Sequence, residues 1–350
     1  MAAVALAFAA APAAHAQTAC DADINGDGVV GASDLAALLS AWGPCMGCAP
    51  DVNDSGDVNA ADLASLLSLW GATCVELPWA TVLEFAPNPA VVTNGSLRKA
   101  ITASGLPWRV RDNASNIEML LVPPGAFNMG CTSPSLGCSS DALPVHSVTL
   151  TNAFYVGRYE VTQAQWTARM GNNPSWFQGT NYPDAATRPV DRVSWNAVQG
   201  FLAQTGLRLP TEAEWEYAYR ADTTTAFHSM PGFPNGTDDA AQLGAIAWLG
   251  TNSGAQTRPV GQKAANGLGL HDMSGNVNEW VNDWYLDTYY AESPAVNPPG
   301  PTEDDFVEER VLRGGAYGYA VASTLRGSTR IAASPNSTLI SNGFRVARNP

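Results

Sequence analysis

The chain has 350 residues, of which 45% are hydrophobic, and its formal net charge at pH 7 is −14. Nucleic acids and anionic membranes are themselves negatively charged, so this acidity excludes both as expected partners. The length leaves room for more than one domain.

Residues 1–16, "MAAVALAFAAAPAAHA", form an apolar stretch that ends in Ala-His-Ala. This pattern is typical of the apolar region and cleavage site of a signal peptide. No charged residue precedes it, so either the true start lies upstream or the signal is a weak one. The apolar run is too short to span a bilayer. We therefore expect a secreted protein, extracellular or periplasmic, without a membrane span.

Two segments match an EF-hand-type calcium loop position by position. The first would supply ligands from Asp23, Asn25, Asp27, the Val29 carbonyl and Asp34, with Gly28 at the sharp turn. The second would supply ligands from Asp51, Asn53, Ser55, the Asp57 carbonyl and Asp62, with Gly56 at the turn. Two loops in one register predict two Ca²⁺ sites. The alternative is an acidic linker that merely resembles such loops.

Each loop is followed by apolar residues at the spacing of one helix face. The two stripes are Leu35, Leu38, Leu39 and Trp42, and then Leu63, Leu66, Leu67 and Trp70. We expect two helices whose stripes bury each other, with no helix before either loop. A loop followed by an exit helix, in tandem over residues 20–74, resembles the dockerin repeat. That resemblance implies a calcium-dependent module for a cohesin-like or other extracellular protein.

The six cysteines suggest disulfides, because their number is even and four of them flank the two repeats. We favour the pairs Cys20–Cys45, Cys48–Cys74 and Cys131–Cys138. Cys45 and Cys48 also form a Cys-x-x-Cys motif, but a single such motif is weak evidence for zinc.

Residues 75–106 resemble a linker with some local structure, because they contain several prolines and the turn-prone Asn94-Gly95. From residue 107 onward, capping boxes and glycine stops predict helices after Thr162, Ser194 and Thr211. Short alternating runs, including "EMLLVPPGAFNMG", "HSVTLTNAFYVGRYEV" and "RVLRGGAY", predict strands around them. The fold class expected for this part is α+β and rich in loops.

Six segments of residues 107–350, in this order, resemble the formylglycine-generating-enzyme, or sulfatase-modifying-factor, family. They are "EMLLVPPGAFNMG", "FYVGRYEVTQAQW", "RPVDRVSWNAVQGF", "RLPTEAEWEYAYRA", "RPVGQKAANGLGLHDMSGNVNEW" and "VLRGGAY" with "NGFRVAR". The resemblance implies an irregular C-type-lectin-like fold, preceded here by a small all-α calcium module.

The resemblance also implies oxidation of a substrate cysteine to formylglycine by copper bound to two cysteines. Those two positions fall at Tyr319 and Thr324, a family serine position falls at Ala316, and no cysteine follows Cys138. Thiolates are the ligands that suit Cu(I), and their absence argues against copper and against this catalysis. Asn278 stands where relatives commonly have tryptophan beside the active cleft.

At one of the family's metal sites, the resemblance places chemically suitable residues at all four ligand positions. It implies a Ca²⁺ held by the side chains of Asp272 and Glu279 and by the carbonyls of Gly275 and Val277. The alternative is an acidic turn without metal. A second family calcium site is doubtful, because Ile246 replaces its asparagine. The histidines His146, His228 and His271 lack metal-site spacing, so we expect them in loops or on the surface.

Two function classes remain open from the sequence. The first is a non-catalytic recognition domain with a peptide, protein or glycan ligand, tethered by the dockerin-like module. The second is an oxidase of the formylglycine-generating type that uses unrecognised active-site residues.

Overall fold

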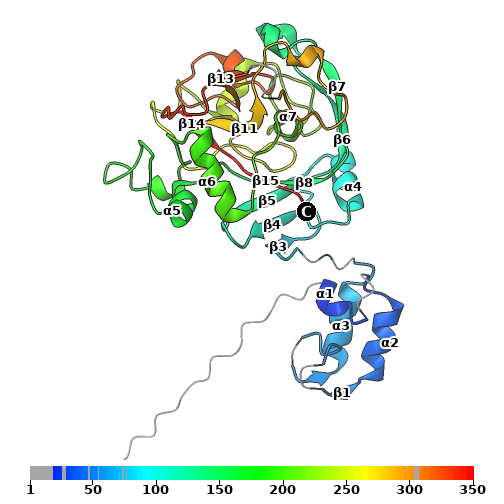
Figure 1. The fold of residues 1–350 in the computed structure, drawn as a ribbon. Coiled ribbons are helices and arrows are strands. Elements are labelled where there is room, and N and C mark those ends of the chain that lie inside the picture. The colour runs from blue at the N-terminus through cyan, green and yellow to red at the C-terminus, as the bar shows by residue number, and fades with distance from the viewer. Residues whose placement is uncertain are drawn as a thin grey trace, which may run out of the picture. The chain divides into compact units, whose positions relative to one another are not determined.

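The computed structural model describes residues 19–25, 29–45, 48–53, 55–72, 75, 77–302 and 307–350 (Figure 1). The chain divides into two compact units between Pro78 and Trp79. The expected signal peptide (1–16) and the predicted residues Asp27, Gly28 and Cys74 lie outside the described part. Among the described residues, no helix has the length and apolar character needed to cross a bilayer.

The N-terminal unit contains the two predicted helices, α2 (Ala32–Ser40) and α3 (Ala60–Ser68). An antiparallel pair of two-residue strands, β1 (Gly43–Pro44) and β2 (Asp57–Val58), joins the repeats. The expectation of no helix before the first loop is wrong. A single turn, α1 (Ala19–Ala22), precedes it, and the side chain of Ala22 is buried in the small core.

The two apolar stripes bury each other only in part. Leu38 and Leu66 are fully buried, and Leu35 and Leu63 pack against them. The remaining members are about half exposed: Leu39 51%, Trp42 50%, Leu67 51% and Trp70 47%. The prediction of mutual burial therefore holds for the inner half of each stripe, because two nine-residue helices can cover only one narrow face of each other. The outer half leaves an equivalent apolar surface on each repeat.

The disulfide prediction is corrected in the N-terminal unit. Cys45 pairs with Cys48, with the two Cα atoms 5.8 Å apart, so the pairs Cys20–Cys45 and Cys48–Cys74 are wrong. The two sulfurs meet locally because only two residues separate these cysteines. The Cys131–Cys138 prediction is confirmed, with a Cα–Cα distance of 5.8 Å.

The large unit is built around two main β-sheets (Figure 1). A five-stranded antiparallel sheet has the order β15-β8-β5-β4-β3, and a four-stranded sheet has the order β13-β12-β11-β14 with β14 parallel to β11. The first sheet contains β3 (Ala80–Glu84), β4 (Arg109–Asp112), β5 (Glu118–Val122), β8 (Phe154–Gly157) and β15 (Ala347–Arg348). The second contains β11 (Asn278–Trp284), β12 (Arg310–Arg313), β13 (Ile331–Ala333) and β14 (Asn342–Phe344).

Two smaller pairs of strands complete the β-structure described for the large unit. β6 (Gly125–Met129) is antiparallel to β7 (His146–Leu150), and β9 (Ala247–Trp248) is parallel to β10 (Ser274–Gly275). Short 3₁₀ turns are η1 (Pro134–Leu136), η2 (Ser140–Ala142), η3 (Ala185–Thr187), η4 (Ala240–Ala245), η5 (Tyr289–Ala291) and η7 (Ala322–Leu325).

The three helices predicted from capping signals are confirmed. They are α5 (Gln163–Met170), α6 (Trp195–Thr205) and α7 (Glu212–Arg220). Thr162 and Thr211 form the expected capping boxes, and α5 and α6 end at left-handed glycines. α7 contacts β6, β11 and β12, so it links the two halves of the unit.

Residues 79–106, expected to be mostly linker, contain two elements of the large unit. β3 pairs with β4, and Asn94 caps α4 (Gly95–Ala103) by accepting hydrogen bonds from the amides of Ser96 and Leu97. α4 buries Leu97 and Ile101. Its stripe is short and follows a proline-rich stretch, which hid it from the sequence.

Candidate functional site

The segment that leaves β12 carries Ala316, Tyr319 and Thr324, which the sequence resemblance assigns to the family's serine and copper positions. It starts with Gly314 (φ +85°) and Gly315 (φ +73°), a backbone that side-chain-bearing residues adopt only with strain. A Cβ on Gly315 would lie 2.7 Å from both the carbonyl oxygen of Thr324 and Cδ2 of Leu325. Glycine therefore allows this turn to pack directly against η7.

The side chains at the family's catalytic positions are bound to their neighbours. Ala316 is buried, and the hydroxyl of Thr324 donates to the Val321 carbonyl at 2.6 Å. The amide nitrogen of Asn278 lies 3.4 Å from the Tyr319 hydroxyl. These atoms are oxygens and an amide, and none is sulfur. The residues present therefore do not fit Cu(I).

Asn278 stands at the centre of a buried polar cluster. Its Nδ2 donates to the side chain of Asn342 at 3.1 Å, and its backbone amide donates to the Ser341 carbonyl at 2.7 Å. Its Oδ1 is buried and has no hydrogen-bond partner. Exposed apolar side chains adjoin the cluster along the chain: Val321 is 61%, Leu339 60% and Ile340 40% exposed. The cluster thus contains a buried unpaired acceptor, and exposed apolar residues lie close to its members in the sequence.

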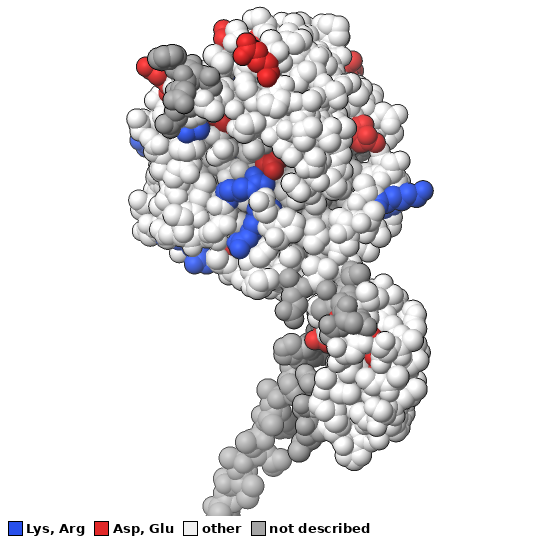
Figure 2. Space-filling model, turned by 45° about the vertical axis from the view of Figure 1, so that its right-hand side comes forward, with Lys and Arg blue, Asp and Glu red and all other residues white. Residues whose placement is uncertain are grey.

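Arginines form a second buried feature of the large unit. Charged side chains are few and scattered on the face that Figure 2 shows, and several arginines are buried instead. Arg345 binds both oxygens of Glu279, each at 2.6 Å, and donates to the carbonyls of Gly157 and His271. The indole nitrogen of Trp215 donates to Glu279 at 2.6 Å. Glu279, a predicted calcium ligand, is therefore already held by two donors.

Asp272, the other predicted carboxylate ligand, is 2% exposed. Its Oδ2 accepts a hydrogen bond from the Gly261 amide at 2.6 Å, but its Oδ1 has no partner. Burial raises the pKa of Asp272 to about 6. Burial, together with the charges of Asp272 and Glu279, also raises the pKa of Glu160 well above its usual value. Three buried carboxylates thus share Arg345, and the unpaired Oδ1 suits a further cation.

The carbonyl ligands predicted for this site lie nearby in the chain. Gly275 ends β10 with φ +82°, and the amide of Val277 donates to Glu160 at 3.0 Å. Across the part of the chain that the structure describes, no group of three or more His, Cys, Asp and Glu side chains is arranged to hold a metal ion. A Ca²⁺ here would therefore depend on carbonyl oxygens as well as carboxylates.

The calcium loops of the N-terminal unit are closed by equivalent carboxylates. Asp34 accepts hydrogen bonds from the amides of Asn25 (3.0 Å) and Gly31 (2.8 Å). Asp62 accepts from the corresponding amides of Asn53 (3.1 Å) and Asn59 (2.8 Å). Burial opposes ionisation of Asp34, yet the amide hydrogen bonds prevail and lower its pKa. The described closing carboxylates of the two loops therefore share one hydrogen-bonding pattern.

In the second loop, oxygens converge from three further residues. Asp51 is 5% exposed and accepts hydrogen bonds from the amides of Ser55 (2.9 Å) and Gly56 (2.7 Å). The Ser55 hydroxyl lies 3.1 Å from the Asp57 carbonyl. These are hard oxygen donors with lone pairs to spare, and they fit Ca²⁺. In the first loop, the described ligands Asp23, Asn25, Val29 and Asp34 occupy the matching positions.

Sequence reasoning missed some of these groups. Glu160 was not singled out, because it follows Arg158 and Tyr159 after the end of β8 and no local pattern marks it as buried. His228, expected in a loop or on the surface, is only 1% exposed, and burial lowers its pKa to about 4. Its ring Nδ1 lies 2.8 Å from the Ser229 carbonyl, which fits a neutral imidazole.

The fold and site define an α+β domain with a C-type-lectin-like architecture behind a tandem calcium-loop module. The chain belongs to the family described as "Sulfatase-modifying factor enzyme 1-like domain", which matches residues 92–350. Residues 21–68 match the "Dockerin type I domain". Both family resemblances seen in the sequence are confirmed.

Proteins similar in sequence to this chain include formylglycine-generating enzymes and a protein named as a chaperone. The formylglycine-generating enzyme of Mus musculus is 29% identical over 288 residues, covering 66% of this chain and 74% of that protein. The formylglycine-generating enzyme of Streptomyces coelicolor is 36% identical over 171 residues, covering 46% of this chain and 52% of that protein. "Chaperone protein LppX" of Paenibacillus barcinonensis is 32% identical over 224 residues, covering 48% of this chain and 72% of that protein.

Two solved structures show the same fold. PvdO from Pseudomonas aeruginosa superposes with a TM-score of 0.58 at 28% identity, covering 69% of this chain and 98% of that chain. Treponema denticola variable protein 1 superposes with a TM-score of 0.57 at 29% identity, covering 67% of this chain and 95% of that chain. The predicted C-type-lectin-like α+β fold is confirmed.

Proposed function

We propose that this protein is a secreted, calcium-binding recognition protein whose large unit is non-catalytic. One observation carries the proposal: Tyr319 and Thr324, the residues that the resemblance assigns to the copper positions, offer hydroxyl groups and no thiolate. Thr324 is engaged with its own backbone, and Tyr319 with Asn278. Hydroxyl oxygens bind Cu(I) poorly, so these positions do not support copper-dependent oxidation.

The recognition surface in this proposal is formed by exposed apolar side chains of the segments after β12 and before β14. Val321 is 61% and Leu339 60% exposed, so both can contact a ligand. Asn278 is buried and links the two segments through Tyr319 and Asn342. A peptide, protein or glycan ligand would pack against the apolar side chains.

The N-terminal unit, in this proposal, docks a cohesin-like or other extracellular protein. The half-exposed pairs Leu39 with Trp42, and Leu67 with Trp70, support this, because each repeat presents an aromatic and an aliphatic side chain at matching positions. Aromatic residues are enriched at the centres of interfaces. Ca²⁺ would hold both loops and so fix the helices that carry these side chains.

A third Ca²⁺, at Asp272, would stabilise the large unit. The buried unpaired oxygen of Asp272 and the excess of carboxylates over guanidinium groups support it. The ion would take side-chain oxygens from Asp272 and Glu279 and the carbonyls of Gly275 and Val277.

Titration of the full chain with Cu(I) against a chromophoric chelator tests the proposal. A formylglycine-generating enzyme that has both cysteines serves as the positive control. We expect the chain to leave the chelator's copper in place while the control removes it. Stoichiometric removal of copper by this chain would overturn the non-catalytic function.

A further inference from the structure

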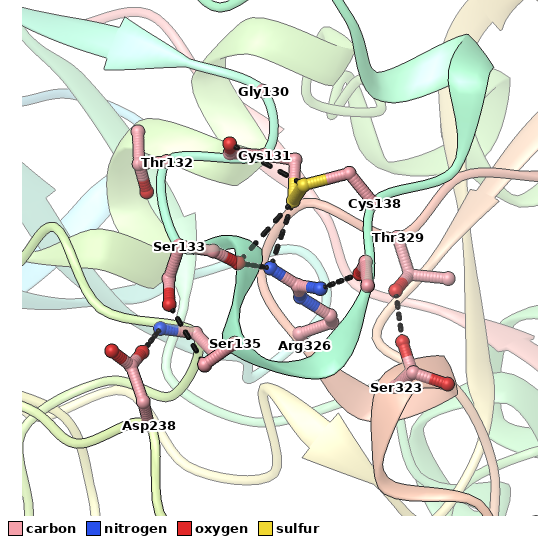
Figure 3. The surroundings of a disulfide bond; sticks show 12 residues. Gly130, Cys131, Thr132, Ser133, Ser135, Cys138, Asp238, Ser323, Arg326 and Thr329 are labelled. Carbon is pink, nitrogen blue, oxygen red and sulfur yellow. Dashed lines mark hydrogen bonds between the residues drawn. A yellow bond between two sulfur atoms is a disulfide. The ribbon is translucent and has the colours of Figure 1, made fainter.

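The Cys131–Cys138 disulfide closes a loop between β6 and β7 (Figure 3), and its two cysteines differ in exposure. Cys131 is 5% exposed and faces the interior, whereas Cys138 is partly exposed. An external thiol therefore reaches the sulfur of Cys138 first. In that case Cys131 is the sulfur that leaves.

A buried guanidinium lies against the leaving sulfur. Arg326 is 3% exposed, and its Nη2 lies 2.9 Å from Sγ of Cys131 (Figure 3). Its other hydrogen bonds go to the carbonyls of Ser133 and Gly137, and its Nε has no partner.

Arg326 is unusual because it lacks a carboxylate. None of the ion pairs among the described residues includes it. By contrast, the buried Arg313, Arg330 and Arg345 each pair with a glutamate. Burying a charge without a counter-charge is costly. Asp238 and Glu216 act on Arg326 through their charges, but neither forms an ion pair with it among the described residues, and the nearest side-chain partner is Sγ of Cys131.

We propose that Cys131–Cys138 is a thiol–disulfide exchange site for dithiols, with Arg326 stabilising the Cys131 thiolate. A thiolate on Cys131 would place an anion in direct contact with the Arg326 guanidinium. A neighbouring arginine lowers a thiol's pKa, and a thiol of lower pKa leaves faster from a disulfide.

The exchange balances as follows. One thiolate of the dithiol attacks Sγ of Cys138, the Cys131–Cys138 bond breaks, and its electron pair stays on Cys131, which becomes a thiolate beside Arg326. The second thiolate of the dithiol then attacks the mixed disulfide and releases Cys138 as a thiolate, which takes a proton from water. The dithiol is oxidised by two electrons to its disulfide, and the protein disulfide is reduced by two.

The test uses the full chain and dithiothreitol as the dithiol. After reduction without denaturant, alkylation of Cys131 by iodoacetamide is followed by peptide mass spectrometry across pH. We expect the midpoint for Cys131 near or below about 7.5, against about 8.5 for an unperturbed thiol. A midpoint at or above about 8.5 would overturn the proposal.

Variants separate the role of the charge from that of packing. Arg326→Gln should raise the Cys131 midpoint by about one unit or more and slow reduction by dithiothreitol about tenfold, because the leaving thiolate loses its cation. Arg326→Lys keeps the charge, so its Cys131 midpoint should lie between those of the parent and of Arg326→Gln. Arg111→Gln, on the surface of β4, is the matched control and should behave as the parent. An unchanged midpoint in Arg326→Gln with native circular dichroism contradicts the proposal, and if that variant does not fold, the parent's midpoint decides.

Discussion

Glu279→Gln tests the buried ion pair that joins β11 to the segment after β14. Both oxygens of Glu279 bind Arg345 at 2.6 Å, and both side chains are at most 1% exposed. The variant keeps the shape but removes the charge, so Arg345 loses its ion-pair partner and keeps its hydrogen bonds to the carbonyls of Gly157 and His271. Breaking a buried pair by neutralising one partner costs about 3–5 kcal/mol. For a unit of this size, that lowers the melting temperature by about 10 °C.

The assay is thermal unfolding of the full chain by calorimetry, with excess Ca²⁺ and with chelator. Because Glu279 is also a proposed calcium ligand, the large unit of the variant should lose its calcium response together with its stability. Glu84→Gln is the matched control. Glu84 pairs with Arg109 near the surface, where the side chains are 33% and 24% exposed, and a pair of that kind is worth at most about 1 kcal/mol. If Glu279→Gln melts like Glu84→Gln in both buffers, the reasoning about both the pair and the metal is refuted.

Two further predictions concern calcium and pH. Chelation should unfold residues 20–74 while the large unit stays folded, and Asp51→Ala should weaken that module likewise; unchanged protease resistance of the segment after chelation would rule this out. The second concerns His228, whose pKa burial lowers from 6.5 to about 4. Between these values the unfolded chain binds a proton that the folded chain does not, so the free energy of unfolding falls as pH decreases, by about 3 kcal/mol in total. Urea denaturation at pH 7 and 4.5 should show a smaller loss in His228→Gln than in the parent, and equal losses would exclude the histidine as the cause.

Local signals predicted the local structure of this protein well. The helices after Thr162, Ser194 and Thr211 begin at their predicted N-caps, and the first two end at the predicted glycines, because these interactions span only a few residues. The calcium loops were recognisable for the same reason. α4 and β3 were missed, because their structure depends on packing within the large unit and not on a strong local pattern.

Long-range pairing was the harder part of the site. The cysteine spacing suggested bridges between the repeats, but Cys45 and Cys48 meet each other. The family resemblance pointed to Glu279, yet only the fold brings Arg345 and Glu160 to it from distant segments. Arg326 contacts Cys131, which lies 195 positions away in the sequence, and no sequence pattern predicts this contact.

The most direct measurement of the central claim is the conversion of a sulfatase-type Cys-x-Pro-x-Arg peptide by the purified chain, with copper and reductant supplied. Mass spectrometry follows the peptide cysteine, and the triple variant Ala316→Ser, Tyr319→Cys, Thr324→Cys reports whether restoring the thiolates restores copper binding. Since the unmodified chain has no thiolate pair at these positions, the account predicts an unchanged cysteine after prolonged incubation. A mass shift to formylglycine with the unmodified chain would contradict the account and show that other residues carry out the oxidation.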